Sequence, residues 1–468
     1  MKRFILTIAL AAMCTAAFAQ KKDIVKTGYN LGPLPVVAYD ADKGLQLGAI
    51  LQLFNYGDGS NYPNYNSKTY LEASFFTKGS MLFQLMYDNK ELIDGVRWSS
   101  AISANFDKGM DFYGFNGYQS YYDFESINAG KAGNQYILPN GNPSTAIFTP
   151  FYKNFRTQIL AKTDFVGNIT EHFKWEAGYH ASYFLQKSID YDNINRGKSE
   201  SQKFPTDQPT LYDYYCKWGL ISPEEANGGF SSSIRLGLTY DSRDKEGAPS
   251  RGIWAEGHLT LAPKWLGTKN DFYRYSLTFR HYVPIVKEDV LTFAYRLNYE
   301  GTFGSNAPYY ILPYITVMGE NCDKDGMGGY RNLRGILRNR VVGLDMATYT
   351  AELRWRFVKF HLIKQNFALG LNLFSDGSMV TRGRDLTFKY SEAASDYEAQ
   401  KAIYNKYVRP DVKERPHISV GAGFRIIMNE NFIIAAEYGM PVSRFNKNNP
   451  LYNQDGTGAF YVNIGYLF

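Results

Sequence analysis

The sequence predicts an all-β protein that forms a single transmembrane antiparallel β-barrel of about 16 strands. Three observations support this prediction: apolar and polar residues alternate along many short segments, the last of these segments ends on Phe468, and the first residues form an export signal. Successive side chains of a strand point to opposite faces, so a barrel wall presents an apolar face to lipid and a polar face to the lumen.

The first residues have the organisation of a secretory signal peptide. Lys2 and Arg3 form a short positive region, an apolar run follows over residues 4–18, and the run closes on Ala-Phe-Ala, which predicts cleavage after Ala19. Lipidation at Cys14 is the alternative, and it is disfavoured because a bulky methionine precedes this cysteine. The predicted organisation is therefore a signal peptide over 1–19, a short periplasmic segment over 20–33 and the barrel over 34–468.

The composition combines many aromatic residues with a polar average. Aromatic residues make up 16% of the chain, with 38 Tyr and 32 Phe, although the mean hydropathy is -0.36. A barrel wall reconciles these values, because its two faces average out and its Tyr and Trp side chains favour the membrane interfaces. The net charge of +6 is spread along the chain without a basic tract, which disfavours a nucleic-acid partner.

Residues 417–426 illustrate the alternation. Ile418, Val420 and Phe424 fall on one face, and Arg425 falls on the other. The segments expected to form strands by the same test are 34–40, 45–55, 67–77, 81–89, 96–107, 155–167, 173–187, 231–242, 252–263, 272–284, 290–302, 343–357, 366–379, 416–428, 431–443 and 457–468.

The connections between these segments differ greatly in length, and short and long ones fall at opposite ends of the barrel. Outer-membrane barrels have short periplasmic turns and long outer loops. We therefore expect the outer membrane of a Gram-negative bacterium, with both termini in the periplasm and with lipid and lipopolysaccharide around the wall. The long connections are 108–154, 188–230, 303–342 and 380–415.

Residues 229–468 carry four motifs that together are similar to one family. They are Tyr240-Asp241-Ser242-Arg243-Asp244 with Pro249-Ser250-Arg251-Gly252, Gly328-Gly329-Tyr330-Arg331-Asn332-Leu333-Arg334-Gly335-Ile336, Ala351-Glu352-Leu353, and Phe374-Ser375-Asp376-Gly377. In this order they resemble the turn between strands eight and nine, the long sixth extracellular loop, and the acidic motifs of strands twelve and thirteen in the BamA-type assembly and translocation barrels, also called bacterial surface antigens.

The resemblance implies an inward-folded sixth loop. In the family the arginine of this loop pairs in the lumen with acids of strands twelve and thirteen, which implies that Arg334 contacts Glu352 and Asp376. The alternation places both acids on the lumenal face. Two carboxylates in a partly desolvated lumen repel each other, and one guanidinium can satisfy both. We expect a structural lock and not a catalytic site; the alternative is an Arg334 exposed to solvent on the loop.

The predicted loop is rich in glycine and departs from the family pattern at two positions. Gly328, Gly329 and Gly335 would allow tight backbone turns in a crowded lumen. Ile336 stands where the family usually has an aromatic residue, and Gly377 follows the strand-thirteen aspartate directly instead of one residue later.

The first and last strands would meet at a seam. The predicted first strand starts beside Pro33 and Pro35, and proline cannot donate to a sheet ladder. Tyr466 and Phe468 share one face of the last strand, as in the C-terminal signature of exported barrels. A seam that opens sideways is one interpretation, and prolines that merely mark the start of a strand are the other.

The functional prediction follows from the resemblance. Only residues 20–33 precede the predicted barrel, so the periplasmic POTRA domains of the family would be missing. We expect a barrel-only relative that aids insertion or translocation of proteins or lipids with a separate periplasmic or outer-membrane partner. The alternative is a passive pore or structural barrel with a plugged lumen.

Other activities have little support. The sequence has no nucleophile elbow, Walker loop or zinc-type pairing, so we predict no enzyme, no cofactor and no metal. Asp323 and Asp325 faintly resemble a calcium loop but lack its other ligands. Cys216 and Cys322 are expected to be unpaired, although an export compartment permits a disulfide.

Overall fold

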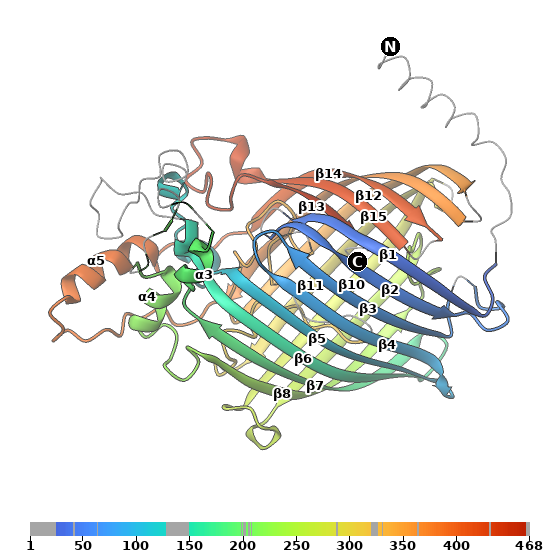
Figure 1. Cartoon of the computed structure of the whole chain (residues 1–468), viewed down its shortest axis with the longest axis horizontal. Helices are drawn as coiled ribbons and strands as arrows, with labels where there is room; N and C mark the ends of the chain where they lie inside the picture. The colour runs from blue at the N-terminus through green and yellow to red at the C-terminus, as the bar shows by residue number, and fades with distance from the viewer. Residues whose placement is uncertain are drawn as a thin grey trace, which may run out of the picture.

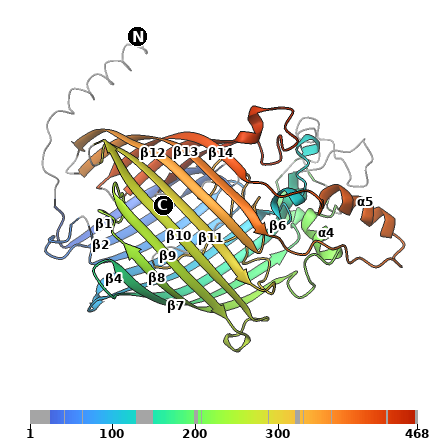
Figure 2. The same cartoon turned by 180° about the vertical axis from the view of Figure 1, so that it is seen from behind.

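The computed structural model is a closed antiparallel β-barrel in which every strand pairs with its neighbours in sequence and β1 pairs with β16 (Figures 1 and 2). The structure describes residues 25–40, 43–62, 64–127, 149–197, 199, 203–204, 206, 208–286, 289–319, 326–329, 331–362, 365–429 and 432–464. The strands are β1 (Tyr29–Asp40), β2 (Gly44–Asn55), β3 (Ser67–Phe76), β4 (Met81–Ile93), β5 (Val96–Asp111), β6 (Lys153–Asn168), β7 (Phe173–Lys187), β8 (Gly228–Asp241), β9 (Gly252–Ala262), β10 (Phe272–Val286), β11 (Leu291–Phe303), β12 (Asp345–Leu362), β13 (Gln365–Arg382), β14 (His417–Met428), β15 (Phe432–Pro441) and β16 (Ala459–Ile464).

Each of the predicted strand segments overlaps one of these strands, so the predicted fold class is confirmed. The largest differences lie at strand ends. β1 begins at Tyr29 and not at residue 34, so Pro33 and Pro35 lie inside the strand. β12 continues to Leu362, because its hairpin with β13 stays paired as far as Leu362 and Gln365. The predicted export signal lies outside the described residues.

The wall has the alternation that the sequence predicts. In β2, Leu47, Leu51 and Leu53 point outward and are exposed, whereas Ile50 between them is buried. Such an outward apolar surface is stable only when lipid covers it. None of the helices in the described part of the chain is both long and apolar enough to cross a membrane.

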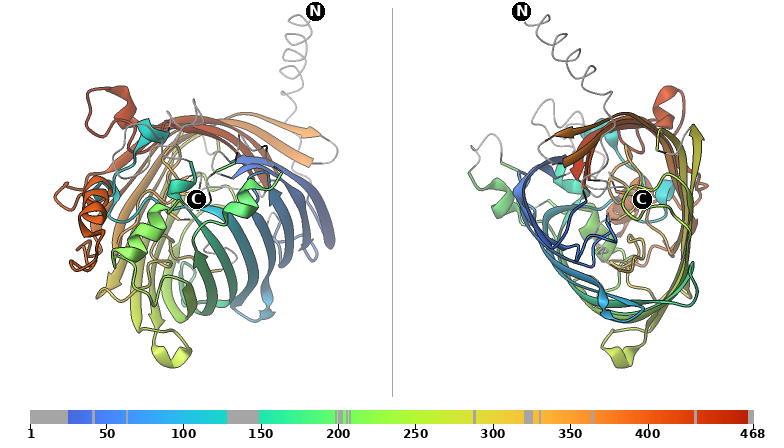
Figure 3. Two further views of the ribbon diagram at one scale, coloured as in Figure 1. Left: turned by 60° about the vertical axis from the view of Figure 1, so that its left-hand side comes forward. Right: turned by 90° about the vertical axis from the view of Figure 1, so that its right-hand side faces the viewer.

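The longest connections all follow odd-numbered strands, so they gather at one end of the barrel, which we call the long-loop end (Figure 1). The loop between β11 and β12, residues 304–344, is named L6 below. The helices of this end are α3 (Tyr191–Asn195), α4 (Leu211–Lys217) and α5 (Tyr397–Tyr407). Views along the barrel show further chain segments inside the ring of strands (Figure 3).

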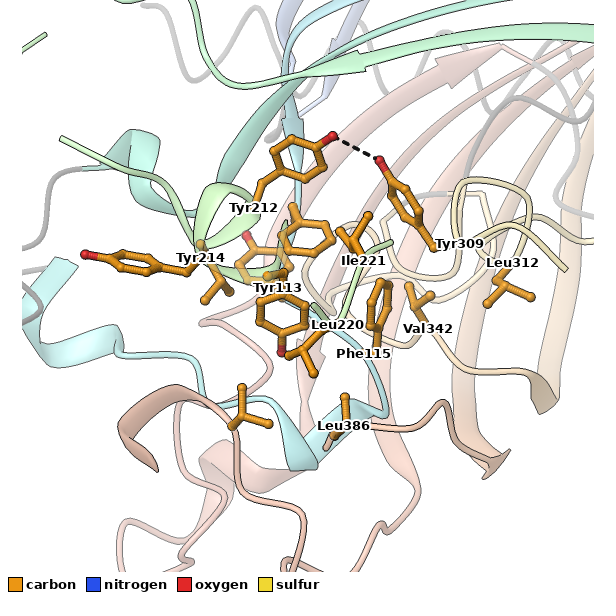
Figure 4. Packing of buried hydrophobic residues seen from close by; sticks show 14 of the residues in the cluster. Tyr113, Phe115, Tyr212, Tyr214, Leu220, Ile221, Tyr309, Leu312, Val342 and Leu386 are labelled. Carbon is orange, nitrogen blue, oxygen red and sulfur yellow. Dashed lines mark hydrogen bonds between the residues drawn. The ribbon is translucent and has the colours of Figure 1, made fainter. Parts of the chain in front are cut away.

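Side chains from four long loops pack into one hydrophobic core, which we call the aromatic cap (Figure 4). Trp218 and Tyr215 are completely buried in it, and the Trp218 indole donates to Gln400 over 3.0 Å. The ring of Phe112 meets that of Tyr215 edge-on at 5.2 Å, a geometry worth about 0.5–1.5 kcal/mol beyond the buried area. The cap therefore folds as a core of its own on the long-loop end.

Helix α4 brings the largest side chains into the cap. Its first turn is fixed by a capping box, in which the hydroxyl of Thr210 accepts from the backbone of Asp213 and the Asp213 carboxylate accepts from the backbone of Thr210. The Tyr309 hydroxyl of L6 donates to the hydroxyl of Tyr212 on this helix over 3.4 Å (Figure 4). The cap thereby joins α4 to L6.

Candidate functional site

L6 forms a compact turn around its Arg-Gly pair. The Gly329 amide donates to the Ile336 carbonyl over 3.0 Å, and the Leu333 amide donates back to the Gly329 carbonyl over 3.2 Å. Leu333 and Ile336 are buried in a small apolar cluster with neighbouring strand residues. At the position of the usual family aromatic residue, Ile336 therefore contributes apolar packing.

Two glycines of this turn are required by its geometry. Gly328 has a φ of 113°, and a Cβ there would lie 2.0 Å from the carbonyl oxygen of Leu337. Gly335 has a φ of 83°, and a Cβ there would lie 2.3 Å from the carbonyl carbon of Gly439 in β15. Only a residue without a side chain lets L6 run directly against the wall at this point.

Arg334 lies in the centre of the site and is completely buried. Its Nε and Nη2 atoms donate to the two carboxylate oxygens of Asp376 over 2.8 and 2.9 Å, and its own amide donates to Asp376 over 3.0 Å. Its Nη1 atom lies 2.7 Å from Glu352. The structure thus brings together the arginine and the two acids that the sequence analysis paired, on β12 and β13.

The sequence analysis missed a third acid and two further arginines of this site, which we call the Arg334 lock. Glu437 on β15 accepts from Arg334 over 2.9 Å. Arg425 on β14 donates to both Glu352 and Glu437 over 3.0 Å, and Arg354 donates to Glu352 over 2.7 Å. The sequence contains one signal for this unpredicted acid: Glu437 is the one charged residue of β15.

The ring of Phe374 completes the Arg334 lock. The Arg334 guanidinium lies 3.5 Å from the centre of this ring, which provides a cation–π contact. Three carboxylates are thus matched by three guanidinium groups in a buried region. Removing one member would leave a buried charge uncompensated, which is strongly destabilising.

The predicted turn motif is structured but separate from the Arg334 lock. Arg243 donates to Asp241 over 2.9 Å and lies over the Trp254 ring at 4.1 Å. The Asp244 carboxylate accepts from both the amide and the hydroxyl of Ser250 over 2.9 and 2.6 Å. These contacts fix the turn between β8 and β9, at the end opposite the long loops.

A family model for the Omp85 superfamily domain matches residues 68–468. The chain belongs to the Omp85 superfamily. Its resemblance to BamA-type barrels is thereby confirmed, and it is an outer-membrane β-barrel protein.

Solved structures give further points of comparison for this Omp85 chain. BamA from Haemophilus ducreyi lacking POTRA domains 1–3 is 15% identical with a TM-score of 0.49, over 98% of this chain and 78% of that one. CdiB from Escherichia coli is 10% identical with a TM-score of 0.49, over 95% of this chain and 63% of that one. No curated protein matches the sequence.

The seam of this Omp85 barrel is short among the described residues. β1 and β16 share the register pair Tyr39–Val462, whereas β15 and β16 are paired from Gly439–Ala459 to Ile434–Ile464. The predicted C-terminal residues Tyr466 and Phe468 lie outside the described residues. In the part of β16 that is described, the Tyr461 hydroxyl accepts from the Gly335 amide of L6 over 3.2 Å.

Pro33 and Pro35 interrupt the edge of β1 that faces away from β2. In an antiparallel sheet each residue directs its N–H and C=O to one neighbour, and successive residues alternate between the two neighbours. The β1–β2 register runs without a break through Pro33–Leu51 and Pro35–Ala49. The ladder to β2 therefore uses the alternate residues, and the two missing donors lie on the edge of β1 that faces away from β2. The prolines do not mark a strand start, which corrects one of the two interpretations of the sequence.

A second buried polar group at the long-loop end was not predicted. The ring of His417 lies between Asp455, 2.6 Å from Nδ1, and Glu414, 3.2 Å from Nε2. Tyr118 stacks on this ring at 3.8 Å and donates to Asp455. Burial alone would raise the pKa of Asp455, but the facing His417 and Arg340 hold it below the ordinary value. Burial and Asp455 raise the pKa of Tyr118.

No metal centre was found in the part of the chain that the structure describes: it contains no group of three or more His, Cys, Asp or Glu side chains placed to hold an ion. The faint calcium pattern at Asp323 and Asp325, and Cys322, lie outside that part. Cys216 is a free cysteine, and burial raises the pKa of its thiol to about 12, which disfavours a reactive thiolate.

Proposed function

We propose that this Omp85 chain aids insertion or translocation of proteins or lipids at the outer membrane, acting with a separate periplasmic partner. One observation carries the proposal beyond family membership: the strand that closes the barrel has a proline-interrupted edge. The two donors missing at Pro33 and Pro35 leave the edge of β1 that faces away from β2 with fewer hydrogen bonds to offer than the edge of a regular strand.

A weak seam favours lateral opening for an energetic reason. The two strands that flank it must separate before a client segment can pass sideways into the membrane. Each main-chain hydrogen bond lost without replacement in an apolar medium costs about 4–6 kcal/mol. A seam with few bonds can open where a fully paired one cannot, and a client strand with free donors would restore the lost pairing.

The orientation in the membrane forms part of the proposal. The short-turn end would face the periplasm together with both termini, and the aromatic cap would face the exterior, surrounded by lipopolysaccharide. The Arg334 lock would then hold L6 as a structural element, without a catalytic role and without a cofactor.

A closed structural barrel is the second candidate, and the aromatic cap is the observation that favours it. The cap packs side chains from four loops across the long-loop end. A barrel of this kind would pass no ions in a planar bilayer and would have no effect on other outer-membrane proteins when it is removed.

Depletion of the protein followed by outer-membrane proteomics separates the two candidates. Under the proposed function, specific outer-membrane proteins or lipids decline after depletion, and re-expression of the wild-type chain restores them. An outer-membrane composition that stays unchanged through depletion, with the cells intact, would support the structural barrel and contradict the proposal.

A further inference from the structure

Besides the Arg334 lock, L6 has a second set of contacts, with the part of the barrel wall that lies opposite the lock. The part of L6 that leaves β11, residues 307–319, is called the outbound limb, and the part that returns to β12, residues 326–344, is called the return limb. Near the end of the outbound limb, the Gly319 carbonyl accepts from Lys162 over 2.6 Å and its amide donates to Asp164 over 3.1 Å. Both wall residues are on β6 and both are buried.

Two more strands hold the outbound limb. Arg235 on β8 donates to the Val317 carbonyl over 2.9 Å. Arg274 on β10 donates to the carbonyls of Ile311 and Tyr314 over 3.1 and 3.3 Å. These bonds have a charged donor, and such hydrogen bonds are roughly twice as strong as those between neutral groups. The outbound limb is therefore anchored on β6, β8 and β10.

The two limbs are joined directly, so the attachment does not depend on the residues between them. Tyr314 and Gly326 form an antiparallel bridge, and the Met327 amide donates to the Pro313 carbonyl over 3.1 Å. The Asn332 side chain donates to the Gly326 carbonyl over 3.1 Å. A force on the outbound limb is thus transmitted to the compact turn that carries the Arg334 lock.

The return limb is bonded to wall strands on either side of the seam, namely β12, β13, β15 and β16 on one side and β5 on the other. The Arg334 lock joins it to β12, β13 and β15, and Gly335 donates to Tyr461 on β16. Arg338 donates to Asp107 on β5 over 2.7 Å, and Asp107 also accepts from Arg156 on β6 over 3.0 Å. L6 therefore connects the β5–β8 part of the wall to the β12–β16 part.

We propose that L6 is a cross-barrel tie whose β6 and β8 anchor, formed by Lys162, Asp164 and Arg235, limits the opening of the β1–β16 seam. The two parts of the wall are continuous through β9–β11, so they can splay only by separating at the seam. A tie between them opposes this movement, and releasing the β6 and β8 anchor weakens the restraint, although Arg338 still joins the return limb to β5. The inference deepens the proposed function, because seam opening is the step that the tie would control.

Hydrogen exchange in the purified full-length protein, measured in lipid nanodiscs without any client, tests the tie. The variant is Lys162→Met with Arg235→Met, and Arg235→Met alone serves as a milder variant. The control is Lys174→Met, which removes a lysine of β7 that pairs with Asp241 over 3.4 Å. A shift in gel mobility on heating shows that each variant is folded.

Release of the anchor is expected to accelerate exchange in two separate places. Amides of the outbound limb should exchange about ten- to a hundredfold faster, the range that follows from losing charged hydrogen bonds. Amides of Val37 and Tyr39, which face the seam, should also exchange several-fold faster, and the control should change neither region. Faster exchange in the limb with unchanged exchange in β1, or no change in either, overturns the tie. Since no client is present, this result is independent of the depletion experiment.

Discussion

Replacing Arg334 by alanine should lower the temperature at which the folded barrel unfolds on a gel. The substitution leaves Glu352, Asp376 and Glu437 close together in a buried region with one guanidinium fewer. Breaking a buried ion pair by removing one partner costs about 3–5 kcal/mol. In addition, carboxylates that the Arg334 guanidinium no longer bridges would repel each other. We expect a loss of this order, together with poorer assembly of the barrel.

The control is Lys389→Ala, which removes a pair with Asp385 in which both side chains are more than half exposed. Such a pair contributes little, because solvent screens it and the flexible side chains lose entropy. Arg334→Lys keeps the charge but lacks the fork of donors, so it should restore the midpoint only in part. An unchanged midpoint and normal assembly of Arg334→Ala would contradict the lock.

Gly335→Ala should be as damaging as the loss of the Arg334 side chain. The new Cβ would lie 2.3 Å from the carbonyl carbon and 2.6 Å from the carbonyl oxygen of Gly439, so L6 would have to move away from β15. This shift would displace the neighbouring guanidinium from its acids. The measurement is the same unfolding midpoint on a gel.

Gly304→Ala separates backbone strain from this steric clash. Gly304 lies in the same loop with a φ of 69°, and no atom lies within 4 Å of a Cβ built there. Both substitutions carry the cost of a left-handed conformation, roughly 1–2 kcal/mol. We expect Gly304→Ala to show this cost alone and Gly335→Ala to lose clearly more. Equal midpoints for the two variants would show that the close approach to β15 is unimportant.

The wall of this barrel could be predicted from sequence, because the direction of each side chain depends only on its position within its own strand. Alternation along β13 determines that Asp376 faces the lumen while Leu371 and Leu373 face outward, and no knowledge of other strands is needed. The first strand was placed too short, because proline was taken as a boundary. Proline is compatible with a strand whenever its missing donor faces away from the paired neighbour, as at Pro33 and Pro35.

The complete lock could not be predicted, because its members come together through the stagger of distant strands. Alternation indicates that Glu437 faces the lumen, but its height relative to Arg334, 103 residues earlier, depends on the register of β12 to β15. The aromatic cap is a stronger example. Tyr215 and Tyr407 come from loops without periodicity, and only tertiary packing makes these loops a core. The anchors of the cross-barrel tie, such as Lys162 and Gly319, arise in the same way.

The central claim is that the seam between β1 and β16 must open, and a reversible disulfide across it is the most direct test. Tyr39 and Val462 are register partners, and Cα atoms of such a pair lie about 4.5–5.5 Å apart, within the range of a disulfide. The variant Tyr39→Cys with Val462→Cys, in a background where Cys216 and Cys322 are serine, replaces the depleted protein. Tyr438→Cys with Phe460→Cys links β15 to β16 on the same outer face and serves as the control.

The measurement is recovery of the outer-membrane proteome after depletion, with the crosslink either closed or reduced. The proposed function predicts that the Tyr39–Val462 crosslink blocks recovery, that a reductant restores it, and that the Tyr438–Phe460 crosslink has no effect. Full recovery with the Tyr39–Val462 crosslink closed would contradict the account, because a barrel that works with a sealed seam does not act by opening it.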